Sequence, residues 1–156
     1  MAALSNDPSG ELDTWKTFEI NYLGRSRVAR LAKEAGVKRC LLTSSCSVYG
    51  FQDGTLTEDS KPNPLNAYAR ANILAEKDNV LSLADDDFTA TASRFAAIYG
   101  LSGRMRFDLA INGMVLGALK TWKIPVMRDG SQWRPFLYVV TRQERFSIYL
   151  RLPRKL

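Results

Sequence analysis

The sequence predicts an α/β fold of three layers with a mainly parallel sheet. Apolar runs that suit buried strands alternate with stretches of helical periodicity, which is the order of βαβ units. Glycine, proline, aspartate and asparagine gather between these stretches, as in loops. The chain has 156 residues, 46% of them hydrophobic and 24% charged, so it has the length and composition of one domain with a buried core.

The first half of the chain is expected to hold a helix, a strand and a second helix. Apolar residues recur on or near one side over 18–35, and Gly36 is a typical helix stop. Residues 37–43 form an apolar run that suits a buried strand. Residues 50–66 have the composition of a loop, and Asn66 is a candidate N-cap for a helix over 67–84.

The second half continues the alternation. After an acidic turn at 85–87 we expect a strand over 88–99, a loop over 100–103 and a helix over 107–119. A short strand over 123–127, a turn at 129–130 and a strand over 134–140 follow. Because βαβ crossovers usually bring successive strands together, the strands near 37–43 and 89–96 should be neighbours.

The net charge of +6 is concentrated at the C-terminal end. Residues 141–156 hold five basic side chains against one acid, Glu144. We interpret this basic tail as a solvated or disordered end; binding to nucleic acid or to a membrane surface is the alternative. No apolar run approaches the roughly 20 residues that span a bilayer, and the first residues do not resemble a signal peptide. We therefore expect a cytoplasmic protein.

Residue usage limits the chemistry. The sequence has no histidine, the commonest metal ligand and general base, so we expect no metal site and acid–base work by tyrosine, carboxylates or lysine. Cys40 and Cys46 are separated by about 20 Å if the chain between them is extended, too far for a disulfide. Cys46 is interpreted as an inert, buried thiol.

Two segments carry the strongest chemical pattern. Residues 43–50 read TSSCSVYG and follow the predicted strand, and residues 68–72 read YARAN and open the second helix. A strand that ends in hydroxyls, next to a helix that presents a phenol, is a candidate proton-transfer site. Taken alone, the two residues favour a structural interpretation, in which Ser45 caps a strand end and Tyr68 is an ordinary residue of an amphipathic helix.

The ordered motifs resemble the extended short-chain dehydrogenase/reductases, in particular the NAD-dependent epimerase/dehydratase family that acts on nucleotide sugars. The resemblance covers about residues 2–139 and implies a Rossmann-like fold, NAD or NADP as cofactor and a nucleotide-sugar substrate. Ser45 matches the family's catalytic serine or threonine and Tyr68 its catalytic tyrosine. Asn72 replaces the lysine of the family's Tyr-x-x-x-Lys motif.

The resemblance also implies residues around the cofactor and the substrate. On the cofactor side these are Ala3, Leu4, Asn21, Thr43, Ser44, Arg94, Ala96 and Ile98. On the substrate side they are Tyr49, Arg104, Arg106, Asn112 and Arg134. Helices 18–35 and 67–84 match those that pair in family homodimers. Cys46 and Ser47 stand where family dehydratases have an Asp-Glu pair, which favours epimerase- or reductase-like chemistry.

One departure from the family concerns the dinucleotide. The sequence has no Gly-x-x-Gly-x-x-Gly segment, whose amides approach the pyrophosphate at a helix N-terminus. We therefore expect residues 1–140 to be the C-terminal part of the NAD(P)-binding domain with part of the substrate region, followed by an atypical tail over 141–156. Weak or absent NAD binding is expected for this chain.

The second departure is Asn72. In the family the lysine favours the ionised phenol and holds the nicotinamide ribose; Asn72 can hydrogen-bond a hydroxyl but carries no charge. Arg70 and Lys77 point to other faces of the same helix and cannot replace it. We therefore expect low or no activity, and a gain of at most two to three orders of magnitude in turnover for Asn72→Lys in a full-length context. The alternatives are a non-catalytic remnant or binding module that keeps the substrate-side half of the fold, and a nucleic-acid binder.

Overall fold

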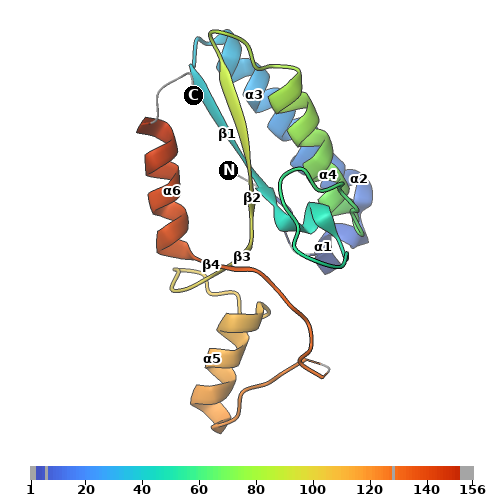
Figure 1. The fold of residues 1–156 in the computed structure, drawn as a ribbon, viewed down its shortest axis with the longest axis vertical. Coiled ribbons are helices and arrows are strands. Elements are labelled where there is room, and N and C mark those ends of the chain that lie inside the picture. Colours follow the sequence, from blue (N-terminus) through green and yellow to red (C-terminus); the bar gives the residue numbers. More distant parts are fainter. Residues whose placement is uncertain (1–2, 6, 128, 152–156) are drawn as a thin grey trace. The chain divides into compact units, whose positions relative to one another are not determined.

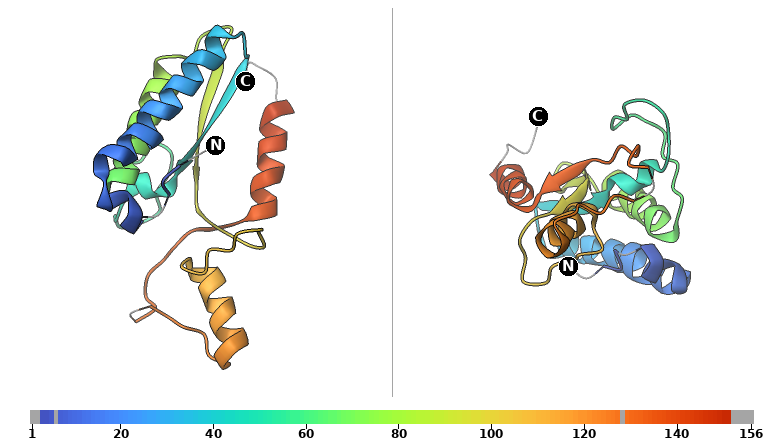
Figure 2. Two further views of the ribbon diagram at one scale, coloured as in Figure 1. Left: turned by 180° about the vertical axis from the view of Figure 1, so that it is seen from behind. Right: turned by 90° about the horizontal axis from the view of Figure 1, so that it is seen from below.

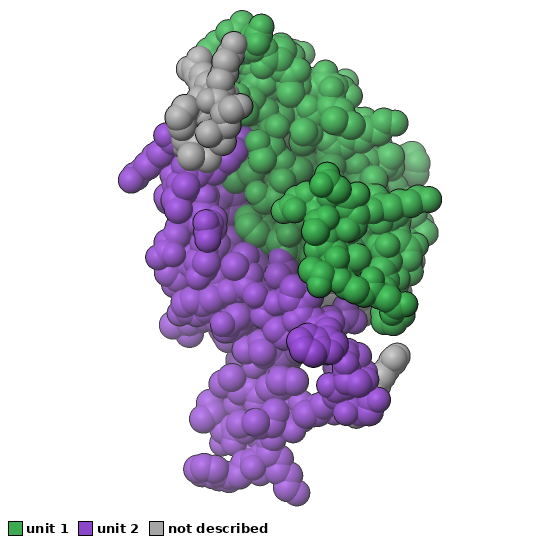
Figure 3. Space-filling model, viewed as in Figure 1, with its two compact units in different colours: residues 1–95 green, residues 96–156 purple. Residues whose placement is uncertain are grey.

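The structure, a computed structural model, describes residues 3–5, 7–127 and 129–151. The chain forms two compact units, residues 1–95 and 96–156, which Figure 3 draws in green and purple. Each unit has its own parallel strand pair, and each is described below by itself.

Unit 1 begins with helices and continues into a parallel βαβ arrangement (Figure 1). Its elements are α1 (Asp7–Leu12), α2 (Thr14–Phe18), η1 (Glu19–Gly24), α3 (Arg25–Glu34), β1 (Arg39–Ser45), η2 (Cys46–Tyr49), α4 (Ala67–Glu76), η3 (Lys77–Leu81) and β2 (Thr89–Phe95). The expected helix over 18–35 is thus η1 followed by α3, and the helix expected over 67–84 is α4 followed by η3.

The strands β1 and β2 are parallel neighbours, which confirms the predicted adjacency. Their register runs from Arg39 opposite Thr89 to Ser45 opposite Phe95. Helices α3 and α4 lie together along one face of this strand pair, as the rear view in Figure 2 shows. The carboxyl ends of both strands therefore reach the same edge of the sheet.

Small side chains let α4 pack closely on its neighbours. Ala67, Ala69, Ala71 and Ala75 are fully buried, and α4 contacts α2, η1 and β1. Asn66 caps this helix as predicted, since its side-chain oxygen accepts from the Ala69 amide at 2.8 Å. The core of unit 1 is completed by residues from other elements, including Ala29, Leu42, Val48 and Phe88.

The loop after η2 is fixed by one glycine. Gly50 has a φ of +62°, and a Cβ added there would lie 1.8 Å from the Asn63 carbonyl oxygen. The Asn63 amide in turn donates to the Val48 carbonyl at 3.0 Å. A side chain at position 50 would therefore collide with backbone that the structure holds in place.

Unit 2 departs further from the expected elements. It contains β3 (Ala97–Tyr99), α5 (Ala110–Thr121), β4 (Phe136–Tyr138) and α6 (Val139–Arg151), with β3 and β4 parallel. The strand expected over 123–127 is wrong, because those residues have no regular structure. The strand expected over 134–140 ends at Tyr138, and the described part of the basic tail is helical, with none of its described residues buried.

Three further observations on the described residues concern membrane spanning, metal binding and the two cysteines. None of their helices is long and apolar enough to cross a membrane. They hold no group of three or more His, Cys, Asp or Glu side chains that could bind a metal ion. Cys40 and Cys46 are both free thiols.

Candidate proton-transfer site

Ser45 is the last residue of β1, at the predicted carboxyl end of its strand. Its backbone is extended, and its hydroxyl oxygen accepts from the Ser47 amide at 3.2 Å, which caps η2. Ser45 therefore has a capping role, which was one of the two interpretations that the sequence allowed. It does not exclude a chemical role, because a hydroxyl that accepts one bond still has its hydrogen to donate.

Tyr68 lies in the first turn of α4 and is half-buried. The start of this helix is held by Asn66 and by Glu11 of α1, whose carboxylate accepts from the Ala67 amide at 2.6 Å. Helix α4 packs against both β1 and η2, so Tyr68 and Ser45 lie on neighbouring elements of unit 1. That their hydroxyls face one another stays a prediction.

Asn72 follows Tyr68 by one helical turn and has no exposed surface. Its amide nitrogen donates to the Tyr68 carbonyl at 3.0 Å, and its amide oxygen accepts from Arg25 Nη1 at 2.5 Å. Both ends of the amide are therefore engaged inside the protein. That Asn72 also hydrogen-bonds a ribose hydroxyl stays a prediction.

Arg25, at the start of α3, is the site residue that the sequence analysis missed. Its side chain is buried, with 5% of the residue exposed, and Nε has no hydrogen-bond partner. Burial lowers the pKa of the guanidinium, while the charge and hydrogen bonding of the Tyr68 phenol oppose that shift. One signal was available: Arg25 follows Asn21 by four residues, so both lie on the same helix face.

The residues expected on the cofactor side differ in their surroundings. Asn21 is fully buried, and its amide pairs with the backbone of Leu4, accepting from the amide at 3.0 Å and donating to the carbonyl at 2.8 Å. It thus fixes the path of the chain at Leu4. Ala3 is exposed and Thr43 half-buried in unit 1, whereas Ala96 and Ile98 are half-buried in unit 2.

Arg94 and Ser44, both expected near the cofactor, meet at Glu76 of α4. Arg94 forms a bidentate pair with this carboxylate, with Nη2 2.7 Å from Oε2 and Nε 3.1 Å from both oxygens, and the Ser44 hydroxyl donates to the same group. Arg94 Nη1 also donates to the Tyr49 hydroxyl at 2.8 Å. Hydrogen bonding to Glu76 is the main reason that the pKa of Arg94 is raised. The network links β1, β2, η2 and α4.

The remaining substrate-side residues lie in unit 2. Asn112 is buried, accepting from the Gly100 amide at 3.3 Å and donating to the Arg106 carbonyl at 3.1 Å, so it fastens the loop before α5. Arg106 pairs with Asp108 at 2.5 Å. Arg104 and Arg134 are exposed, as a diphosphate-binding role would require.

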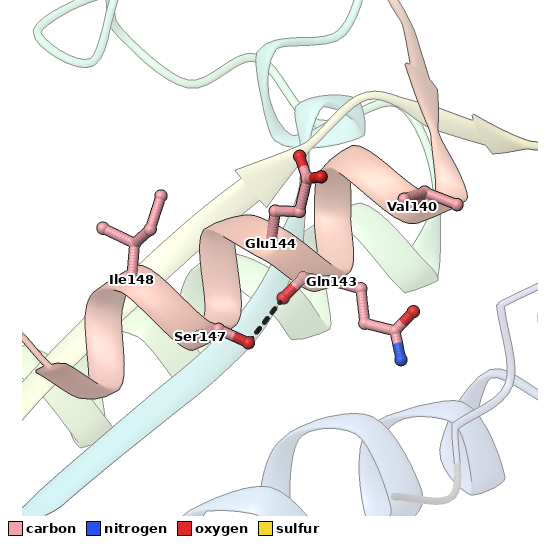
Figure 4. Close-up of a pocket in the computed structure, with 5 residues that line it drawn as sticks. All are labelled: Val140, Gln143, Glu144, Ser147 and Ile148. Carbon is pink, nitrogen blue, oxygen red and sulfur yellow. Dashed lines mark hydrogen bonds between the residues drawn. The ribbon is translucent and has the colours of Figure 1, made fainter.

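Unit 2 also has a hollow along α6, shown in Figure 4. It is lined by Val140, Gln143, Glu144, Ser147 and Ile148. The Ser147 hydroxyl donates to the Gln143 carbonyl at 3.2 Å. One carboxylate beside an internally bonded hydroxyl forms no arrangement of acid, base and nucleophile, so the candidate chemistry stays with Ser45, Tyr68 and the groups around them.

Comparison with known proteins identifies the family. Residues 1–141 match the NAD dependent epimerase/dehydratase family. UDP-glucuronate 4-epimerase of Thermodesulfobacterium geofontis is 29% identical over 126 residues, which are 80% of this chain and 38% of that protein. An uncharacterized UDP-glucose epimerase, YtcB of Bacillus subtilis, is 25% identical over 119 residues, 76% of this chain and 37% of that protein.

Solved structures agree with this assignment. MoeE5 in complex with UDP-glucose and NAD matches with a TM-score of 0.78 at 30% identity, over 97% of this chain and 51% of that one. TunA, an NAD-dependent NDP-hexosamine 5,6-dehydratase, shares the fold with a TM-score of 0.84 at 23% identity. The match covers 99% of this chain and 52% of TunA. The chain spans about half the length of these structures and less than two fifths of the two epimerases named above. With its parallel strands, its Rossmann-like α/β fold and a family match over residues 1–141, this chain belongs to the NAD-dependent epimerase/dehydratase family.

Proposed function

We propose that this chain supplies the proton-transfer residues of an NAD-dependent epimerase or reductase that acts on a nucleotide sugar. The observation that carries the proposal is the group formed by Tyr68, Asn72 and Arg25, on helices that pack beside the strand ending at Ser45. The MoeE5 structures, at 28–30% identity, contain NAD with UDP-glucose or UDP-glucuronic acid, which supports this substrate class.

In this proposal Tyr68 exchanges a proton with a hydroxyl of the sugar, and Ser45 donates a hydrogen bond to the same oxygen as negative charge develops on it. NAD, when bound, supplies hydride transfer. Cys46 and Ser47 offer neither a strong acid nor a strong base beside this position. The proposal is therefore epimerisation or reduction rather than dehydration.

The described residues fit only part of an NAD site. The half-buried hydroxyls of Ser45 and Tyr68, with a buried guanidinium behind Tyr68, suit the polar groups of a nicotinamide riboside and a sugar. The glycine-rich helix start that receives the pyrophosphate is not in the sequence. We therefore propose that NAD binds weakly to this chain alone, and calorimetry showing micromolar affinity would contradict that.

The function is tested in a chimera. The chain is fused behind the N-terminal half of the Thermodesulfobacterium epimerase, and NAD-dependent conversion of UDP-glucuronate is measured. We expect turnover that falls at least about 100-fold in Tyr68→Phe, the low end of what a positioned acid–base group contributes. The control is Tyr22→Phe, which removes a phenol on η1 and should leave turnover unchanged. A folded chimera that binds NAD and nucleotide sugar without turnover would favour the binding-module alternative.

A homodimer is proposed on a separate observation. Leu23 and Leu31, 45% and 55% exposed, line a shallow groove on η1 and α3 together with Arg27, Arg30 and Glu34. Apolar surface rimmed by charge is typical of a contact surface. We expect Leu31→Glu to convert a dimer to monomer in analytical ultracentrifugation, with exposed Leu12→Glu as control. A parent chain that stays monomeric over a 100-fold range of protein concentration would overturn this proposal.

A further inference from the structure

We propose that Glu76 is a positioning residue, which aligns the helix that carries Tyr68 with the strand end that carries Ser45. It acts through a clamp, a group of hydrogen-bonded side chains from four elements of unit 1: Ser44, Tyr49, Glu76 and Arg94. The inference rests on the proposed chemical roles of Ser45 and Tyr68. Glu76 acts on the reaction through these two residues and does not itself touch the substrate.

Glu76 is the last residue of α4 and lies about two helical turns after Tyr68. Its side chain is only 11% exposed. The carboxylate accepts hydrogen bonds from both strands of the sheet, from Ser44 of β1 and from Arg94 of β2. These two residues are partners in the strand register, and Ser44 directly precedes Ser45. One carboxylate therefore ties the phenol-bearing helix to the strand pair, next to the strand end.

The guanidinium of Arg94 extends the link to η2. Its Nη2 lies 2.7 Å from Oε2 of Glu76, and its Nε lies 3.1 Å from both carboxylate oxygens. Nη1 donates to the Tyr49 hydroxyl at 2.8 Å, and Cζ lies 4.9 Å from the centroid of the Tyr49 ring. Nη1 also donates to the Glu58 carbonyl at 3.3 Å, in the loop between η2 and α4. Because Tyr49 is the last residue of η2, which Ser45 caps, the clamp reaches both ends of the candidate site.

The geometry of the clamp fixes an alignment as well as a contact. Two parallel hydrogen bonds from a planar guanidinium to a carboxylate hold the two groups in one relative orientation. Because α4 is a continuous helix, a shift at Glu76 also displaces Tyr68. Reaction rates depend steeply on such shifts, since a misplacement of about 1 Å can lower the rate about 100-fold. Glu76 is thus placed to affect turnover without contacting the reacting atoms.

Other hydrogen bonds hold α4 without reaching the strands. The Asn66 side chain comes from the preceding loop and Glu11 from α1, and both bind backbone amides of the first turn. The Asn72 amide binds Arg25 of α3. Of these groups, Glu76 is the one that joins α4 directly to both β1 and β2.

The first test uses the 156-residue chain, without cofactor or substrate, and follows amide hydrogen exchange by NMR. Tyr49→Phe removes the hydroxyl that joins η2 to the clamp and keeps the Glu76–Arg94 ion pair. The Gly50 amide donates to the Ser47 carbonyl at 3.1 Å and reports on η2. We expect it to exchange at least about tenfold faster than in the parent, because η2 opens locally more often. Amides of the β1–β2 ladder should keep the parent's rates.

A second variant separates alignment from stability. Ser44→Ala, Glu76→Leu and Arg94→Met together replace the carboxylate and its donors, so none of these groups is left without a partner. We expect a urea midpoint close to the parent's but still at least about tenfold faster exchange at Gly50. Tyr22→Phe, which removes a phenol hydroxyl from η1, is the control and should not change this exchange. The parent's rate at Gly50 in either clamp variant would overturn the inference.

The chimera described above gives a kinetic test. Glu76→Leu should lower kcat per folded enzyme about 100-fold and leave the KM for UDP-glucuronate nearly unchanged. Glu76→Gln keeps an acceptor oxygen for Arg94 and should retain most of the turnover. The parent's kcat in Glu76→Leu, or a change in KM alone, would overturn the positioning role. An inactive chimera together with faster Gly50 exchange in the clamp variants would overturn the proposed function and leave the alignment by Glu76 standing.

Discussion

Asn72→Lys is expected to destabilise the protein, although the sequence alone suggested that it would repair the site. Asn72 has no exposed surface and Arg25 is 5% exposed, so the new ammonium would be buried beside the guanidinium that Asn72 now binds. Two like charges about 4 Å apart repel by about 4 kcal/mol at an effective dielectric constant near 20. The lysine also cannot accept the Arg25 hydrogen bond. A lysine at position 72 should therefore be tolerated better when Arg25 is absent.

The assay is urea unfolding at pH 7 of the parent, Asn72→Lys, and Asn72→Lys combined with Arg25→Thr. A loss of about 4 kcal/mol corresponds to a fall of about 2 M in the urea midpoint. The double variant carries one buried cation again and should recover most of this loss, whereas Asn72→Lys combined with Arg27→Thr should not. The reasoning is refuted if Asn72→Lys unfolds at the parent's midpoint, or if the Arg25 and Arg27 combinations unfold alike.

Three other variants test the packing around the site. Gly50→Ala should lower the free energy of unfolding in urea by at least about 2 kcal/mol more than Gly54→Ala. Both glycines have positive φ, but only at position 50 would the new Cβ lie 1.8 Å from a backbone atom. Equal losses for the two variants would contradict this clash. Glu76→Ala should lower the free energy of unfolding by roughly 3 kcal/mol, because it leaves the largely buried Arg94 without its carboxylate partner. Adding Arg94→Met should restore stability. If the losses from the two single substitutions simply add in the double variant, the Glu76–Arg94 ion pair does not contribute to stability. Burial raises the pKa of the Cys40 thiol, so a smaller fraction of the thiol is ionised at pH 8. Iodoacetamide should therefore label Cys40 more slowly in the folded chain than in the urea-unfolded chain, as followed by mass spectrometry. Equal labelling rates would contradict the burial of this thiol.

The sequence by itself determined the features that depend on neighbouring residues. Alternating apolar runs and helical periodicity were enough to place β1 next to β2 and to put Ser45 at a strand end. The Asn66 cap was predictable because its partner, Ala69, is three residues away. The ordered motifs around Ser45 and Tyr68 were also enough to identify the family, since such motifs lie within short stretches of the chain.

The local sequence pattern did not predict the conformation of short segments whose own preference for helix or strand is weak. Residues 123–127 have the apolar content of a strand but no regular structure, and the strand ending at Tyr138 gives way directly to α6. A strand is stable only when its backbone groups pair with another strand, so short apolar runs do not decide their own conformation.

Only the tertiary structure decided the electrostatics of the site. Arg25 and Asn72 are 47 residues apart, and nothing near Asn72 in the sequence shows that a guanidinium reaches it from another helix. The same holds for Glu76, which gathers Ser44 and Arg94 from two strands. Charges act over a few ångströms in space regardless of their separation along the chain. The sequence thus shows that the family's lysine is replaced by Asn72, and the fold shows that a buried guanidinium from another helix binds this asparagine.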